Sequence, residues 1–239
     1  KLSNIHFVST GVYKKRLIKM GENPKNVFNV GSINLEKIKD IKLYTKSEIE
    51  KKLKIKFLKK IVLFTLHPET LNLKEINNQI KISVNSLNYL KDTTVIMTLP
   101  NHDVGSGKII SKLKKICREK KNYHFFHSLG KKMYFSCLNF ANLLVGNSSS
   151  GVIEAPSFKK YSVNLGDRQK GREMSKSVIS VEFKEKKIKK ILKFAINKKF
   201  PGSIKNPYFK KNSSKNVLDI LKKINLKDII YKDFYELRN

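Results

Sequence analysis

The chain has 239 residues, of which 40% are hydrophobic, enough for a packed core and too many for a disordered chain. Its formal charge of +32 comes from 51 basic and 19 acidic residues, and such a charge would favour nucleic acid or an acidic membrane as a partner. We expect neither, because only five of the basic residues are arginine and the lysines are spread along the whole chain.

From the N-terminus onward, short β-rich apolar runs alternate with longer stretches in which apolar residues recur at helical spacing. The expected strands are residues 5–9, 27–30, 61–66, 94–99, 123–126, 143–145 and 161–165. The expected helices are residues 74–90, 105–117, 131–140, 150–157, 184–197 and 213–224. Strands that alternate with helices are typical of a parallel sheet. The sequence therefore predicts an α/β fold with a doubly wound, Rossmann-like parallel sheet.

We predict three parts along the chain. Residues 1–40 have a strand, helix, strand pattern followed by a linker, which would be the end of a preceding Rossmann-like domain. Residues 41–222 would form a second Rossmann-like domain, and residues 223–239 a C-terminal helix that packs back toward the first. The chain begins at Lys1 without a leader pattern, and its apolar runs are far shorter than the roughly 20 residues of a membrane helix. We expect a cytoplasmic protein whose N-terminal part precedes this sequence.

Polar loops follow five of the predicted strands, at the edge of the sheet where open α/β proteins bind ligands. In one of them, Ser148, Ser149 and Ser150 lead into a helix, and we name these three residues the serine loop. Free N–H groups and the helix dipole favour an anion there, although an ordinary serine N-cap has the same pattern. Glu154 lies four residues after Ser150 on the same helix face. Its carboxylate could bind the hydroxyls of a ribose or only offset the helix dipole.

Two of the five arginines, Arg168 and Arg172, lie in one glycine-flanked loop, where they could bind a diphosphate or face solvent. His67 precedes Pro68 at the end of a buried strand, which holds it extended at the sheet edge. Besides a structural role, His67 could donate a hydrogen bond to phosphate or act as an acid when the leaving group departs. His102 and Asp103 are weaker candidates. No residue requires a metal or other cofactor, since Cys117 and Cys137 lack metal-ligand spacing.

Together these loops resemble the hydrolysing UDP-N-acetylglucosamine 2-epimerases, which begin sialic-acid synthesis in bacteria, and relatives that act on similar UDP-sugars. The resemblance rests on GENP at 21–24 with VFNVG at 27–31, HPET at 67–70, Pro100-Asn101, residues 146–156 and VNLGDRQKGR at 163–172. It covers nearly the whole chain but only the C-terminal part of the family's length. The family has two Rossmann-like domains in a glycosyltransferase-B-like arrangement, with the active site between them.

The resemblance implies that UDP lies on this domain. The serine loop and Arg172 would contact the diphosphate, and Glu154 would contact the ribose. Leu129 and Gly130 would lie against the uracil, and His67 near the diphosphate and sugar, with Asn101 and Arg168 as further UDP-binding candidates.

In the family, a base removes the proton at C2 of the sugar as UDP leaves C1, and water then adds to the 2-acetamidoglucal to give N-acetylmannosamine. The acid and base carboxylates come largely from the N-terminal domain, so we expect this chain alone to be inactive. The resemblance also implies a homo-oligomer, a dimer or larger, for the full-length enzyme.

Three alternatives remain open. The first is the same reaction on a UDP-diacetamido sugar. The second is a glycosyltransferase of the same two-domain fold, since a UDP site does not fix the reaction. The third is a basic module that binds nucleic acid or a membrane surface, which should show steep salt dependence.

Overall fold

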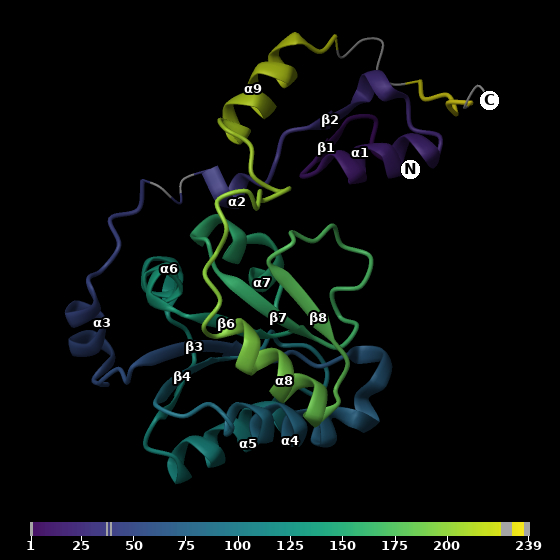
Figure 1. Ribbon diagram of the computed structural model, residues 1–239. Helices are drawn as coiled ribbons and strands as arrows, with labels where there is room; N and C mark the ends of the chain where they lie inside the picture. The colour runs from purple at the N-terminus through teal and green to yellow at the C-terminus, as the bar shows by residue number, and fades with distance from the viewer. Residues whose placement is uncertain (1, 37, 39, 226–230, 237–239) are drawn as a thin grey trace. The chain divides into compact units, whose positions relative to one another are not determined.

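Six parallel strands form the sheet of residues 42–205, the larger of two units into which the chain divides (Figure 1). The computed structural model describes residues 2–36, 38, 40–225 and 231–236. In spatial order the strands are β5 (Tyr123–Phe126), β4 (Thr93–Thr98), β3 (Lys60–Thr65), β6 (Leu143–Gly146), β7 (Tyr161–Leu165) and β8 (Val178–Val181). The predicted doubly wound parallel sheet is confirmed, and β8 is an edge strand that the sequence analysis did not predict.

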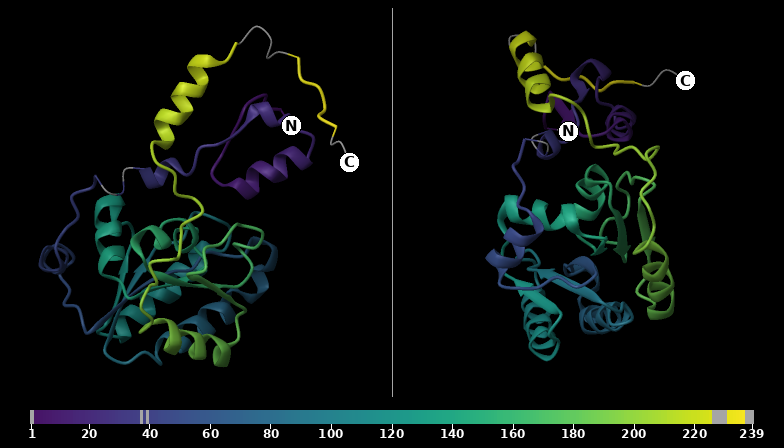
Figure 2. Two further views of the ribbon diagram at one scale, coloured as in Figure 1. Left: turned by 45° about the horizontal axis from the view of Figure 1, so that its top comes forward. Right: turned by 60° about the vertical axis from the view of Figure 1, so that its left-hand side comes forward.

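Helices cover both faces of this sheet (Figures 1 and 2). On one face lie α4 (Ile76–Leu87), α5 (Ser106–Glu119) and α8 (Glu185–Ala195), whose buried side chains join one hydrophobic core with the strands. On the other lie α6 (Gly130–Phe140) and α7 (Ser150–Ile153), with α3 (Lys46–Leu53) packed on α6. Short 3-10 helices are η1 (Pro24–Asn26), η2 (Thr70–Glu75) and η3 (Ala155–Phe158). In the described part of the chain, no helix is both long and apolar enough to cross a membrane.

Local sequence explains where two of these helices form. Thr45 and Glu48 make a capping box at the start of α3, because each side chain accepts the backbone N–H of the other residue. In α8, Ile188, Leu192 and Ala195 are completely buried, while the intervening lysines lie toward solvent. This amphipathic pattern fixes which face of α8 meets the core.

The order of the strands reverses between β3 and β6, so the loops that follow these two strands flank a crevice at the carboxyl edge of the sheet. Thr65 and Gly146 are partners at this edge. Gly146 has a φ of +131°, and a Cβ atom at this position would collide with the carbonyl oxygen of Thr65. Glycine is therefore required for β6 to approach β3 so closely where the polar loops begin.

The smaller unit combines residues 1–41 with residues 206–239. Its parallel strands β1 (His6–Val8) and β2 (Val27–Asn29) are joined by α1 (Gly11–Lys19), and α2 (Ile33–Glu36) contacts α9 (Ser213–Lys223). Tyr208 is 2% exposed, and its hydroxyl lies 2.8 Å from that of Tyr13. The two ends of the chain thus share one core.

The structure corrects two parts of the predicted division. Residues 206–222 belong to the smaller unit and not to the larger domain. The expected C-terminal helix over residues 223–239 is also wrong in the described part, because α9 ends at Lys223 and residues 231–236 are not helical. Residues 226–230 and 237–239 lie outside the described residues. The Tyr235 N–H donates to the Gly21 carbonyl at 3.1 Å, so the C-terminal segment contacts residues 1–41.

Candidate functional site

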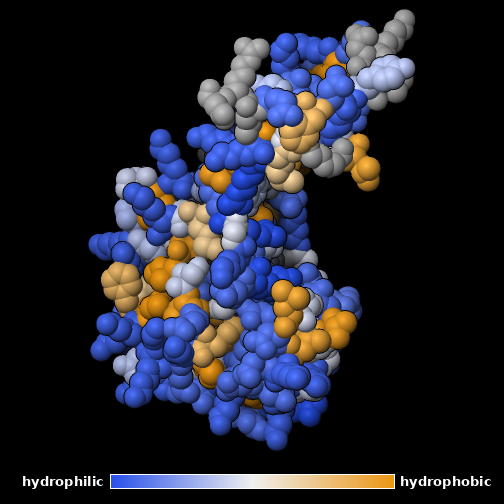
Figure 3. Space-filling model, turned by 90° about the vertical axis from the view of Figure 1, so that its right-hand side faces the viewer, coloured by the Kyte–Doolittle hydropathy of each residue, from blue (hydrophilic) through white to orange (hydrophobic). Residues whose placement is uncertain are grey.

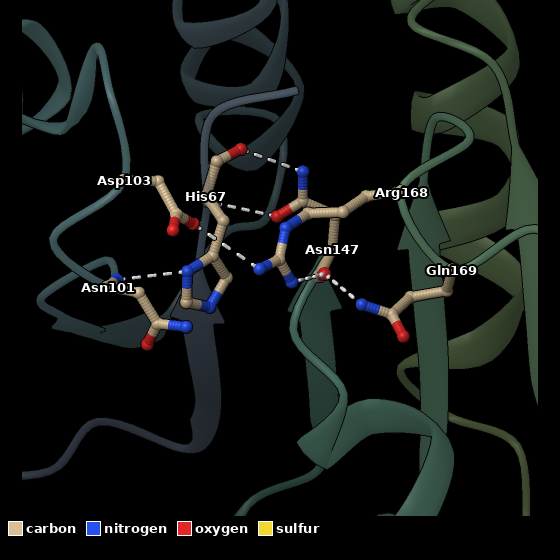
Figure 4. A network of polar contacts seen from close by, with 6 residues as sticks. All are labelled: His67, Asn101, Asp103, Asn147, Arg168 and Gln169. Atoms are coloured by element: carbon tan, nitrogen blue, oxygen red, sulfur yellow. Dashed lines mark hydrogen bonds and ion pairs between the residues drawn. The ribbon is translucent and has the colours of Figure 1, made fainter. Parts of the chain in front are cut away.

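A network of polar contacts connects the loops after β3, β4, β6 and β7, at the crevice edge of the sheet (Figure 4). Its members are His67, Asn101, Asp103, Asn147, Arg168 and Gln169. His67, Asn101 and Arg168, which the sequence analysis singled out separately, therefore lie in one cluster. The cluster forms because parallel strands bring their carboxyl ends to the same edge.

His67 is held as a neutral hydrogen-bond donor. The backbone N–H of Asn101 donates to its Nδ1 at 3.0 Å, which leaves the proton of the neutral ring on Nε2. Burial, helped by the positive charge of Arg168, lowers the pKa of His67 to about 4, and Asp103 opposes the shift only in part. An imidazolium is therefore scarce at neutral pH. Of the two predicted functional roles, this state favours a hydrogen-bond donor over an acid.

Arg168 lies at the mouth of the crevice between two acceptors. Its guanidinium donates to the carbonyl of Asn147 at 3.4 Å and lies 3.5 Å from the carboxylate of Asp103. The ion pair is partly exposed, so it holds Arg168 weakly and an incoming anion can compete with it. Beside it is a pocket of about 550 Å³, lined by residues 68–72, Asp103, Asp167 and Arg168. That size suits a small molecule.

The serine loop follows β6 on the other side of the crevice. The predicted helix over residues 150–157 is divided into one turn of α7 and the 3-10 turn η3, which contains Pro156. A single turn has little macrodipole, so the dipole argument made from the sequence is weaker than expected. Among the described residues, no hydrogen bond uses the N–H groups of Ser148 and Ser149. These two groups are available to an anion.

Glu154 lies just beyond α7 and keeps one carboxylate oxygen for a ligand. Burial raises the pKa of Glu154, while a hydrogen bond from Ser150 and the charge of Arg172 act in the opposite direction. Ser150 is in turn held by the hydroxyl of Tyr134 at 2.6 Å. Oε2 of Glu154 is buried, and within the described part of the chain it has no hydrogen-bond partner. A buried acceptor of this kind suits the hydroxyls of a bound molecule.

The remaining predicted residues lie nearby but are not part of the network. Arg172 is exposed, and its charge acts on Glu154. Leu129 and Gly130 form the start of α6, where Leu129 is half-buried. No hydrogen bond or ion pair between described residues joins either of them to His67. Their predicted contact with a base therefore stays a prediction.

Sequence analysis missed several residues that hold this site. Asn147 and Gln169 are almost completely buried and connect the loops, and Tyr134 fixes Ser150. Glu69 accepts hydrogen bonds from the N–H of Asp167 at 2.9 Å and from the side-chain amide of Gln79 at 3.0 Å. The first bond joins the loop of His67, residues 67–70, to the loop of residues 166–172, which we name the arginine loop. Asn147, Gln169 and Glu69 lie in loops quoted for the resemblance, whereas Tyr134 lies on α6, where no sequence pattern pointed to it. Among the described residues, no group of three or more metal-binding side chains could hold a metal ion.

Comparison with known proteins identifies the family of this chain. A profile of the UDP-N-acetylglucosamine 2-epimerase family matches residues 1–222. The chain belongs to this family. The resemblance inferred from the loops is therefore confirmed, together with the glycosyltransferase-B-like fold class.

Individual members of the UDP-N-acetylglucosamine 2-epimerase family match most of the chain. The polysialic acid biosynthesis protein P7 of Escherichia coli is 38% identical to this chain. The alignment covers 99% of this chain and 61% of the Escherichia coli protein. The GDP/UDP-N,N'-diacetylbacillosamine 2-epimerase (hydrolyzing) of Campylobacter jejuni is also 38% identical, over 99% of this chain and 62% of its own length. This chain thus spans about three fifths of the length of these relatives.

A solved structure supports the fold. The UDP-GlcNAc 2-epimerase of Methanocaldococcus jannaschii, in complex with UDP-GlcNAc and UDP, superposes with a TM-score of 0.74 at 19% identity. The superposition covers 92% of this chain and 61% of the archaeal one.

Proposed function

We propose that this chain supplies the UDP-binding half of a hydrolysing UDP-sugar 2-epimerase, with UDP-N-acetylglucosamine as the substrate. The observation that carries the proposal is the grouping of neutral His67, Arg168 and the unused N–H groups of the serine loop at one edge of the sheet. All of these groups donate hydrogen bonds, and one is a cation. Such a set binds an anionic diphosphate.

The rest of UDP then follows from the order of the loops. The diphosphate lies among His67, Arg168 and the serine loop, with Arg172 at its exposed side. Oε2 of Glu154 accepts the ribose hydroxyls, since burial and the lack of a partner among the described residues leave it free to do so. The uracil lies toward Leu129 and Gly130, and the sugar toward Asn101.

The role of these residues in the reaction is to stabilise the leaving group. As a base removes the C2 proton, the C1–O bond breaks and negative charge develops on the departing diphosphate. The Nε2–H of His67 and the guanidinium of Arg168 stabilise that charge. Water then adds to the 2-acetamidoglucal to give N-acetylmannosamine.

The base itself is expected from outside this chain. Asp103 pairs with Arg168 in the chain without ligand, and Glu154 is assigned to the ribose, so we assign removal of the C2 proton to neither carboxylate. We therefore expect this chain to bind UDP without turnover. Turnover would belong to a longer chain, which we propose to be a homo-oligomer.

Calorimetric titration of UDP into the 239-residue chain tests the proposal. Saturable binding is expected, and Glu154→Ala and Arg172→Ala should each weaken it about tenfold or more, because each removes a hydrogen bond that involves a charged group. Arg118→Ala is the matched control, since Arg118 is exposed on α5 and should not affect binding. A folded chain that binds no UDP, or two variants that bind it normally, would contradict the proposal.

A second substrate is favoured by one comparison. The Campylobacter jejuni relative is named for a diacetylbacillosamine nucleotide, and the pocket beside Arg168 has the exposed side chain of Leu71 at its rim. An apolar rim could contact the methyl of an additional acetamido group. Calorimetric titration of UDP-N-acetylglucosamine and of a UDP-diacetamido sugar under the same conditions decides between the two substrates. Tighter binding of the diacetamido sugar would favour the second.

A further inference from the structure

The side chain of Asn147 makes hydrogen bonds with the main chain just beyond β3, as a neighbouring strand would. Asn147 follows β6 directly and is completely buried. Its Oδ1 accepts the backbone N–H of His67 at 2.7 Å, and its Nδ2 donates to the backbone carbonyl of His67 at 2.9 Å (Figure 4). This reciprocal pair continues the β3–β6 hydrogen bonding beyond Thr65 and Gly146. The carboxamide thus fixes the main chain of His67, from which the imidazole projects.

The backbone of Asn147 acts on the opposite side of the crevice. Its carbonyl accepts hydrogen bonds from Nε2 of Gln169 at 2.8 Å and from the guanidinium of Arg168 at 3.4 Å. Gln169 is only 1% exposed, so the arginine loop is anchored to Asn147 by a buried contact. One residue is therefore bonded to both loops that carry the anion-binding side chains.

We propose that Asn147 is a positioning residue that sets the separation and orientation of His67 and Arg168 for a nucleoside diphosphate. The inference rests on the proposed function, since it assumes that the diphosphate binds between these two side chains. Asn147 itself need not touch the ligand.

The proposal has a physical consequence for His67. Without the carboxamide, the buried N–H and carbonyl of His67 lose their partners, and the loop must move toward water to regain them. Such a movement takes Nδ1 away from the N–H of Asn101. It also changes the distance from the imidazole to Arg168 and Asp103, the charged groups that act on it. Both the tautomer and the pKa of His67 then change.

The test uses three variants of the full 239-residue chain. Asn147→Ala removes both hydrogen bonds to His67, and Asn147→Asp keeps an acceptor but loses the donor. Asn142→Ala is the matched control, because Asn142 precedes β6 and its Oδ1 accepts the N–H of Ile61 at 2.9 Å. It therefore bridges the same two strands at the opposite edge of the sheet.

The first readout is the imidazole of His67, followed by ¹⁵N NMR without ligand. In the wild type we expect one tautomer with the proton on Nε2. In Asn147→Ala we expect a mixture of tautomers and a pKa raised by about one unit or more, since the ring loses its burial. Asn147→Asp should raise the pKa as well, because its carboxylate adds a negative charge and faces the His67 carbonyl oxygen, and Asn142→Ala should match the wild type. The second readout is UDP affinity, which Asn147→Ala should lower about tenfold or more; adding His67→Ala to it should lower affinity little further.

Unchanged tautomer and pKa of His67 in folded Asn147→Ala would overturn the proposal. If Asn147→Ala does not fold, Asn147→Asp decides: a wild-type His67 signal together with wild-type UDP affinity would overturn it as well. If the wild type binds no UDP, the proposed function fails. The NMR titration still shows whether Asn147 positions His67, so the two failures are distinguishable.

Discussion

Single residues at the carboxyl edge of the sheet decide how closely the loops approach each other. Gly146 and Gly130 both have positive φ, of +131° and +63°. They differ in their surroundings, because a Cβ atom at Gly146 would meet the Thr65 backbone, whereas one at Gly130 would meet no atom within 4 Å. Substitution at Gly130 therefore tests backbone strain alone, whereas substitution at Gly146 adds a steric collision with Thr65.

We predict that Gly146→Ala destabilises the larger unit by more than about 3 kcal/mol, because strand β6 must move away from β3. Gly130→Ala should cost only about 1 kcal/mol, the strain of a left-handed residue. Urea denaturation followed by circular dichroism measures both. Equal losses for the two variants would mean that the close contact with Thr65 is unimportant.

His67 should make stability depend on pH. Its folded pKa of about 4 lies below the ordinary value of 6.5, so the unfolded chain takes up the proton first as the pH falls. The stabilisation is complete above pH 6.5 and is lost progressively toward pH 4, by about 3 kcal/mol in total. His67→Asn should remove this slope. Unfolding free energies of variant and wild type, measured every half unit of pH, should diverge in this window; parallel curves would show that burial does not perturb His67.

For single residues, the sequence predicts a functional role when the chemical type of the side chain indicates it. It does not do so when the role depends on contacts with residues far away in the chain. His67 and the two arginines were singled out because charged or titratable side chains after strands are informative by themselves, and Glu154 because it lies one helical turn after Ser150. Asn147 was missed because its role comes from two hydrogen bonds to a residue 80 positions away. No local pattern encodes such a pairing.

At the scale of elements, the buried strands and amphipathic helices followed from their periodicity. Central strands such as β3 are continuous apolar runs, and such runs are visible in the sequence. β8 was missed because it is a four-residue edge strand, only partly buried, that follows a loop in which six of twelve residues are charged. Helix 150–157 was overextended because Pro156 and the turn at Glu154 divide it into α7 and η3.

The amphipathic face of α8 gives the prediction at this scale. Leu192→Ala should destabilise the larger unit by about 2 to 5 kcal/mol, since Leu192 is completely buried against the sheet. Lys193→Ala, at the exposed neighbouring position, should change stability by less than about 0.5 kcal/mol. Thermal unfolding of the two variants provides the measurement. A small effect of Leu192→Ala would show that α8 packs loosely.

Across the whole molecule, the main feature is charge. The chain carries a formal charge of +32, and hydrophilic side chains cover most of the face shown in Figure 3. Such a surface attracts any polyanion through counterion release, whatever its sequence. The charge is therefore a poor guide to the ligand, and the arginines at the crevice are a better one.

We expect RNA to bind this chain weakly and to lose more than about tenfold in affinity between 50 and 200 mM salt. UDP, which would release few counterions, should lose much less. Fluorescence anisotropy of a labelled RNA, with and without UDP, tests this. RNA binding that persists at high salt and is displaced by UDP would instead support the alternative of a nucleic-acid-binding module.

The division into two units has a consequence for synthesis on the ribosome. Residues 42–205 are contiguous, so the whole of the larger unit is translated before residue 206. In the smaller unit, Tyr13 must wait for Tyr208, which is translated 195 residues later. At about 5 to 20 residues per second this delay is about 10 to 40 s. Until Tyr208 is translated, the βαβ segment of residues 6–29 lacks that part of its core, and translation that stalls before Tyr208 would leave the contact between Tyr13 and Tyr208 unmade.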